Sequence, residues 1–135
     1  MNVPTVMLVL GIGMAVAAAG CSSAADCCGG GPSRGVVRHV VLFKFKDAAT
    51  AEQVKGIAEK FRNLKSRIPQ ILDFEWGTNV SPENHAQGFT HCFFLTFRDA
   101  AARDAYLPHP AHKEFGAQLG PILDKVLVVD YVSRD

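Results

Sequence analysis

The sequence has little of what several functional classes require. Fourteen basic and thirteen acidic residues nearly cancel, leaving a net charge of +1, and the basic residues form no stripe. A chain without a field of one sign attracts neither nucleic acid nor an acidic lipid surface, so we expect no nucleic-acid partner. The sequence also has no internal repeat and no glycine-rich phosphate loop, which argues against nucleotide or flavin enzymes. We therefore expect no cofactor.

Cysteine is scarce: the four residues are Cys21, Cys27, Cys28 and Cys92. None of them stands at a metal-ligand spacing with a histidine, so we expect no metal site. Cys27 and Cys28 are neighbours, and a ring closed between adjacent cysteines is strained, which favours intermolecular bridges or free thiols. Cys92 falls within an apolar strand pattern, where cysteine acts as a small apolar residue.

No hydrophobic run is long enough to span a bilayer. The apolar run over 6–19 is shorter than the roughly 20 residues of a membrane helix and fits the core of a signal peptide. The small residues before Cys21 resemble the lipid-attachment site of bacterial lipoproteins, so we expect cleavage after Gly20 and lipidation of Cys21. An ordinary secretory peptide is the alternative, because Ala18 stands where leucine is usual and Met1–Thr5 carries no Lys or Arg.

Three regions of different composition divide the chain. After the signal peptide (1–20), residues 21–35 are rich in Ser, Ala and Gly, which predicts a flexible tether. Residues 36–135 then have room for one domain and a single core. These regions predict a protein of the bacterial cell envelope that is anchored in the membrane by lipid and faces the periplasm or the exterior.

Hydrophobic periodicity predicts four strands and two helical regions in the domain. The capping-box pattern from Thr50 to Gln53 opens the first helix, and Pro69 ends it. The expected strands are 36–46, 71–80, 89–97 and 125–132, and the second helical region covers 99–106 and 110–123. The order β-α-β-β-α-β predicts an α+β, ferredoxin-like domain with both helical regions on one face of an antiparallel sheet. We expect the first and third strands to be parallel neighbours at its centre.

The segment 106–112, Tyr-Leu-Pro-His-Pro-Ala-His, is the most informative stretch. Each proline disfavours helical geometry in the residue before it, so Leu107 and His109 are predicted to be extended. Pro110 suits a first helical position and can begin a helix that carries His112. The result is a stiff break that aims ring side chains at whatever lies beneath it. The alternative is a simple helix kink whose histidines are solvated.

Strand order and parity predict that four ring groups converge. His39 and His91 lie near the starts of the first and third strands, on the side that carries the aromatic residues. If those strands run parallel, both histidines lie at one end of the sheet, and the following helical region brings Tyr106 and His112 there. We therefore expect a ligand pocket lined by His39, His91, Tyr106 and His112.

The other sheet face has no helix left to cover it. It carries Val40, Leu42, Cys92 and Phe94. A bare apolar surface of this size marks a partner site, so we expect a homodimer through the open sheet face.

Several motifs occur in an order and spacing that resemble the stress-responsive dimeric α/β-barrel (Dabb) family over 36–132. They are Arg38–Lys46, Trp76-Gly77, Gly88–His91, Tyr106–His112 and Val129–Tyr131. The resemblance implies that two open sheet faces pack into a dimeric barrel. In a plant polyketide cyclase of this family, the residues matching Tyr106 and His112 are the catalytic pair. The residues matching His39 and His91 line the same pocket there.

The ring cluster suits proton transfer, because neutral imidazole can act as a general base and a tyrosine hydroxyl can donate to an enolate oxygen. We expect the protein to bind a small apolar or aromatic ligand. One alternative is a cofactor-independent enzyme, an aldol-type cyclase or a monooxygenase-like catalyst, in which His112 and Tyr106 are catalytic. A second alternative is a purely structural dimeric stress protein, because strand histidines often serve only to hold a fold together.

Overall fold

The computed structural model describes residues 35–134. The signal peptide, the lipidation site at Cys21 and the pair Cys27 and Cys28 lie outside the described residues and stay predictions. Within 35–134, no helix is long and apolar enough to cross a membrane. The elements in chain order are β1 (Val37–Phe45), α1 (Ala51–Arg67), β2 (Ile71–Thr78), β3 (His91–Phe97), α2 (Ala100–Tyr106), α3 (Pro110–Leu119) and β4 (Leu123–Val132).

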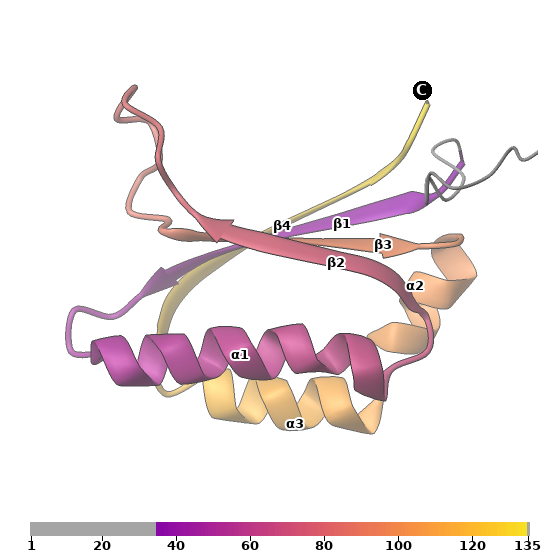
Figure 1. Cartoon of the computed structure of the whole chain (residues 1–135), viewed down its shortest axis with the longest axis horizontal. Helices are drawn as coiled ribbons and strands as arrows, with labels where there is room; N and C mark the ends of the chain where they lie inside the picture. The colour runs from indigo at the N-terminus through magenta and orange to yellow at the C-terminus, as the bar shows by residue number, and fades with distance from the viewer. Residues whose placement is uncertain (1–34, 135) are drawn as a thin grey trace, which may run out of the picture.

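The four strands form one sheet in the order β2-β3-β1-β4, and every neighbouring pair is antiparallel. Helices α1 and α3 lie along one face of this sheet, which gives the ferredoxin-like α+β fold predicted from the sequence (Figure 1). The expected parallel pairing of β1 with β3 is wrong, since Val37 lies opposite Phe97 and Phe43 opposite His91. The helical crossover from β1 to β2 keeps the strand direction, but the hairpin from β2 into β3 reverses it.

Helix α1 begins as predicted. The Thr50 hydroxyl accepts from the Gln53 backbone N–H at 3.2 Å, and the Gln53 side chain accepts from the Thr50 N–H at 2.9 Å, so the capping box is complete. Its apolar stripe packs against the sheet through Ile57, Ala58, Phe61 and Leu64. The helix ends at Arg67, and its C-cap residue Ile68 is extended because it precedes Pro69.

The break between α2 and α3 follows the sequence only in part. His109 is extended (φ −58°, ψ 135°) and caps α3, with Pro110 at the start of that helix as predicted. Leu107 is helical (φ −58°, ψ −46°), contrary to expectation, because its N–H closes the last turn of α2 on the Arg103 carbonyl. Helix α3 stops at Leu119 rather than at position 123, since Gly120 and Pro121 follow.

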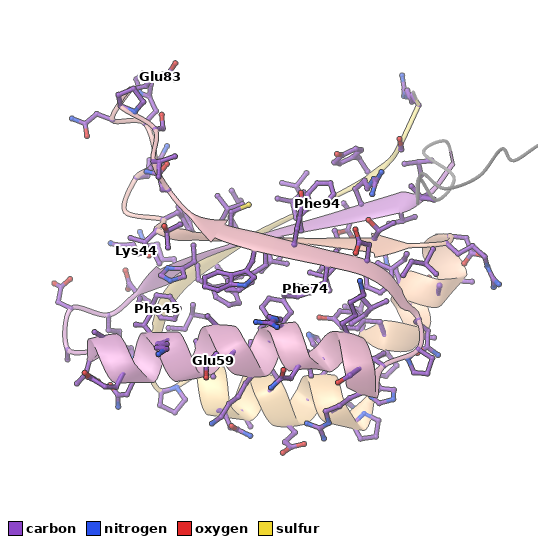
Figure 2. All side chains as sticks on the ribbon, viewed as in Figure 1. Lys44, Phe45, Glu59, Phe74, Glu83 and Phe94 are labelled. Atoms are coloured by element: carbon purple, nitrogen blue, oxygen red, sulfur yellow. The ribbon has the colours of Figure 1, made fainter. Side chains whose placement is uncertain are left out.

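The two faces of the sheet differ in what covers them. Phe45 and Phe74 project toward the helices, whereas Phe94 projects to the opposite, open side (Figure 2). On the open side Val40 and Leu42 alternate with the buried residues of β1 and remain partly exposed. The edge strand β4 adds apolar surface to this side, because Leu127, Val129 and Tyr131 stand opposite Leu42, Val40 and Arg38 and are each between 46% and 48% exposed.

Candidate functional site

Three of the four predicted rings come together on the helix-covered face. His39 comes from β1, Tyr106 is the last residue of α2, and His112 lies in the first turn of α3. The ring centroid of Tyr106 is 4.4 Å from that of His112 and 5.8 Å from that of His39. We call these three residues the His–Tyr cluster. Its contacts confirm that the α2–α3 break aims ring side chains at the sheet.

The Tyr106 hydroxyl is the unusual group of the cluster. The residue is 0% exposed, and its hydroxyl has no hydrogen-bond partner within the described residues. An unpaired buried hydroxyl costs about 1–3 kcal/mol, so such groups call for an explanation. Burial raises the pKa of Tyr106 far above its ordinary value, which keeps the hydroxyl protonated. Tyr106 is therefore a hydrogen-bond donor without an acceptor.

His112 is held in one tautomer by the break itself. Its Nδ1 lies 2.9 Å from the Leu107 carbonyl oxygen. A carbonyl only accepts, so the Nδ1 must carry the proton and donate it. The lone pair of Nε2 is then free to accept a proton from a bound molecule. The side chain is only partly buried, which leaves the cluster open to solvent on this side.

His39 is held in the same way by the strand next to it. The residue is 5% exposed, and its Nδ1 lies 2.6 Å from one carboxylate oxygen of Asp130 on β4. Burial lowers the pKa of His39, and the hydrogen bond and charge of Asp130 oppose that shift. The other Asp130 oxygen accepts from the Arg103 guanidinium of α2. The neutral ring donates through Nδ1 and, like His112, leaves Nε2 as its acceptor.

Asp130 and Arg103 are absent from the residues predicted for this site. The cross-strand register is the signal that could have identified Asp130, because Asp130 stands directly opposite His39 in the β1–β4 pairing. The Cβ atoms of directly opposed residues lie about 4.5–5.5 Å apart on the same face of the sheet, so this register brings the side chains of His39 and Asp130 into contact. That register cannot be read from strand boundaries alone. No sequence signal identified Arg103.

His91 does not join the cluster, which corrects the four-residue pocket. Because β1 and β3 are antiparallel, His91 lies opposite Phe43, at the far end of the strand pair from His39. Its ring centroid is 5.1 Å from that of Phe45 and 6.1 Å from that of Trp76. Burial lowers the pKa of His91, and no charged group contributes to the shift. The expected shared parity with the aromatic face is nevertheless present.

Aromatic rings fill much of the space between the sheet and the helices. Phe61 of α1 stacks on Phe115 of α3 at 4.6 Å and on Phe43 of β1 at 5.7 Å. This packing separates the His–Tyr cluster from His91. A hollow of about 370 Å³ lies near His91, beside the β2–β3 loop; it is lined by His91, Leu42, Cys92 and the loop, and not by the cluster.

The arrangement can bind an oxygen function and move a proton. A carbonyl or phenolic oxygen placed beside Tyr106 would satisfy the orphan hydroxyl. The imidazole rings of His39 and His112 are both neighbours of the Tyr106 ring. Within residues 35–134, no three His, Cys, Asp or Glu side chains gather as metal ligands would.

Two curated plant proteins are similar to this chain over most of its length. The stress-response A/B barrel domain-containing protein HS1 of Arabidopsis thaliana is 42% identical over 99 residues, which are 73% of this chain and 91% of that protein. Olivetolic acid cyclase of Cannabis sativa is 35% identical over 98 residues, covering 73% and 97%.

Solved structures agree with this similarity. Hydroxynitrile lyase from Passiflora edulis superposes with a TM-score of 0.69 at 30% identity, covering 75% of this chain and 94% of that one. A dimeric ferredoxin-like protein of unknown function from Jannaschia superposes with a TM-score of 0.63 at 28% identity, covering 72% and 98%. The family model for the stress responsive A/B barrel domain (Dabb) matches residues 37–133. The chain belongs to this family.

Proposed function

We propose that the protein binds a small apolar or aromatic molecule that carries a carbonyl or hydroxyl oxygen, at the His–Tyr cluster. The buried Tyr106 hydroxyl carries this proposal, because it is a donor without an acceptor between two imidazoles. The aromatic surroundings favour a planar, apolar body on the ligand. The ligand enters from the side of His112, the only member of the cluster that is not fully buried.

Tyr106→Phe tests the proposal. It removes only the orphan hydroxyl, so we expect stability to stay level or to rise by up to about 1 kcal/mol. Acetophenone, which has an aromatic ring and a carbonyl, serves as the probe, and its binding is followed by ligand-detected NMR. Binding should weaken at least tenfold in Tyr106→Phe. If instead Tyr106→Phe destabilises the fold and binding is unchanged, the structural alternative holds.

A second candidate function, proton transfer without a cofactor, is favoured by the tautomer of His112. With Nδ1 committed to the Leu107 carbonyl, Nε2 can remove a proton from the carbon next to a carbonyl while Tyr106 stabilises the enolate oxygen. The relatives include a cyclase and a lyase, and aldol-type ring closure or cleavage would use these two steps.

Deuterium exchange into the methyl group of acetophenone measures this chemistry directly. We expect the wild-type protein to accelerate exchange and His112→Gln to lose at least tenfold of that rate. His109→Asn is the matched control, because Asn at an N-cap replaces the capping His109 while the cluster stays intact. Equal rates in the wild type and His112→Gln would remove the catalytic candidate and leave binding.

We further propose that two copies associate through the open sheet face. The partly exposed apolar residues of β1, β3 and β4 on this face and the dimeric structural neighbours support the proposal. Phe94→Glu places a charge at the centre of the face and should yield monomers in light scattering at micromolar concentration. Val80→Glu changes an apolar residue that is 90% exposed in the loop after β2, outside the sheet, and is the control. A wild-type protein that is monomeric at that concentration would contradict the proposal.

Export and lipid attachment at Cys21 rest on the sequence alone. The apolar run at 6–19 and the small residues before Cys21 support cleavage after Gly20 and an anchor in the cell envelope. Cys21→Ala should leave the precursor uncleaved and should lose labelling by a radioactive fatty acid. Normal processing of that variant would show an ordinary signal peptidase instead.

A further inference from the structure

A short chain of ionic contacts connects the buried His39 ring to the surface of α2. Arg103 donates to one oxygen of Asp130, and the other oxygen of Asp130 accepts from His39 Nδ1 at 2.6 Å. The side chains of Arg103 and Asp130 are 23% and 26% exposed, whereas that of His39 is 6% exposed. Arg103 also contacts Asp104, its neighbour on the helix, at 2.7 Å. The three elements β1, β4 and α2 thus meet at a single carboxylate.

We propose that Arg103 is a positioning residue that fixes the tautomer of His39 through Asp130. The guanidinium holds one carboxylate oxygen, and the geometry of the pair aims the second oxygen at His39 Nδ1. The proton is thereby kept on Nδ1, and Nε2 remains the acceptor of a ring whose centroid lies 5.8 Å from that of Tyr106. The use of that acceptor rests on the proposed ligand site, but the positioning does not.

The surroundings of His39 leave Asp130 as the group that decides the tautomer. Strand β3 contributes apolar neighbours, with Leu95 opposite His39 in the register and the Phe97 ring 6.0 Å away. Strand β4 contributes Asp130, α2 contributes Arg103 and Tyr106, and α3 contributes His112. Asp130 is the hydrogen-bond acceptor of this set that contacts the ring.

Burial explains why the tautomer needs a fixed carboxylate. It lowers the pKa of His39, so the ring is neutral at pH 7.5 and has one proton to place on either nitrogen. A carboxylate free to rotate would bind the ring less consistently. Arg103 removes that freedom, since its planar guanidinium is held on Asp104 through Nε and donates to Asp130 through Nη1.

Nitrogen-15 NMR of the imidazole distinguishes the two tautomers without any ligand. In the wild-type protein at pH 7.5, we expect the His39 shifts of an Nδ1–H, Nε2-acceptor ring. In Arg103→Gln the Nε2–H form should grow from a trace to about one third of the population. Arg103→Lys keeps the positive charge but lacks the planar guanidinium. We expect its population of the Nε2–H form to lie between those of the wild type and Arg103→Gln.

Arg98→Gln is the matched control, because Arg98 is an arginine 78% exposed that pairs with Asp99 near the same helix. It should leave the His39 spectrum unchanged. A pure Nδ1–H form in Arg103→Gln would overturn the proposal. Failure of the wild-type protein to bind acetophenone would instead overturn the proposed function and leave the tautomer result standing.

Discussion

His39 and His91 are the same residue type on the same face of the sheet, yet they have opposite surroundings. His39 lies at one end of the β1–β3 pair, where Asp130 binds its Nδ1 and Arg103 binds the carboxylate. His91 lies at the other end, where its ring stacks parallel to Trp76 with an interplanar angle of 4°. A hydroxyl, Thr90 Oγ1 at 2.9 Å, is its hydrogen-bonding partner.

The difference shows that the cross-strand partner of a strand histidine, and not the face on which the histidine lies, determines its hydrogen bonding and its tautomer. Both rings face the helices, and burial lowers the pKa of both. Only at the end where β4 supplies a carboxylate and α2 supplies Tyr106 does an imidazole acquire a fixed tautomer next to an unpaired hydroxyl. At the other end the ring serves mainly as one more aromatic group.

The largest effect that separates the two ends is expected from replacing each histidine by phenylalanine. His39→Phe leaves the partly buried Asp130 without its imidazole donor and should cost about 2–3 kcal/mol of unfolding free energy. His91→Phe inserts an aromatic ring among aromatic rings and should stay within about 1 kcal/mol of wild type. Urea denaturation followed by circular dichroism measures both.

A second variant shows where the His39 cost arises. Asp130→Asn together with His39→Phe also removes the carboxylate that has lost its imidazole donor, so the double variant should recover part of the loss. Equal costs for the two single His→Phe variants would mean that the ends do not differ energetically.

The two histidines also show which features of the structure can be predicted from the sequence alone. Helix and strand periods, the Thr50–Gln53 capping box and Pro110 at the start of α3 are local signals, and the structure confirms each of them. The direction of β3 relative to β1 is a property of chain connectivity. Because β3 runs antiparallel to β1, His91 lies at the opposite end of the pair from the predicted position, but on the predicted face.

The site was harder to predict than the fold because it depends on side chains meeting across elements. The contact of Tyr106 with His112 follows from the local sequence of the seven residues 106–112, and it agrees with the prediction. The pairing of Asp130 with His39 needs the exact β1–β4 register, and the ion pair with Arg103 needs the position of α2 over the sheet. The filling of the interior by Phe61 and Phe115 needs the helix–helix packing.

A smaller effect is expected from pH. Because burial holds the pKa of His39 below 6.5, the folded protein binds fewer protons than the unfolded chain in that range. The contribution of His39 to folding stability should therefore be fully present above pH 6.5. It should decline as the pH falls toward the lower pKa that His39 has in the folded protein. One proton corresponds to at most about 1.4 kcal/mol per pH unit.

Comparing variants assigns that pH dependence to the two ends. His91 contributes with the same sign, since burial also lowers its pKa. Between pH 7.5 and 5.0, the melting temperature should fall less steeply in His39→Phe than in wild type. His91→Phe should likewise show a shallower fall than wild type. Parallel curves for all three proteins would show that carboxylates elsewhere dominate the acid response.

The smallest expected effect is that of His91→Phe on ligand binding. His91 and the His–Tyr cluster lie at opposite ends of the β1–β3 pair, and the packed rings of Phe43 and Phe61 lie between them. A ligand of the size of acetophenone that contacts Tyr106 should not contact His91. We therefore expect its dissociation constant to change less than about twofold, a difference below 0.5 kcal/mol. His112→Ala, measured in the same titration, should weaken binding at least tenfold. A loss of binding in both variants would mean that the ligand displaces the phenylalanines and spans the whole face, which would restore a pocket shared by all four rings.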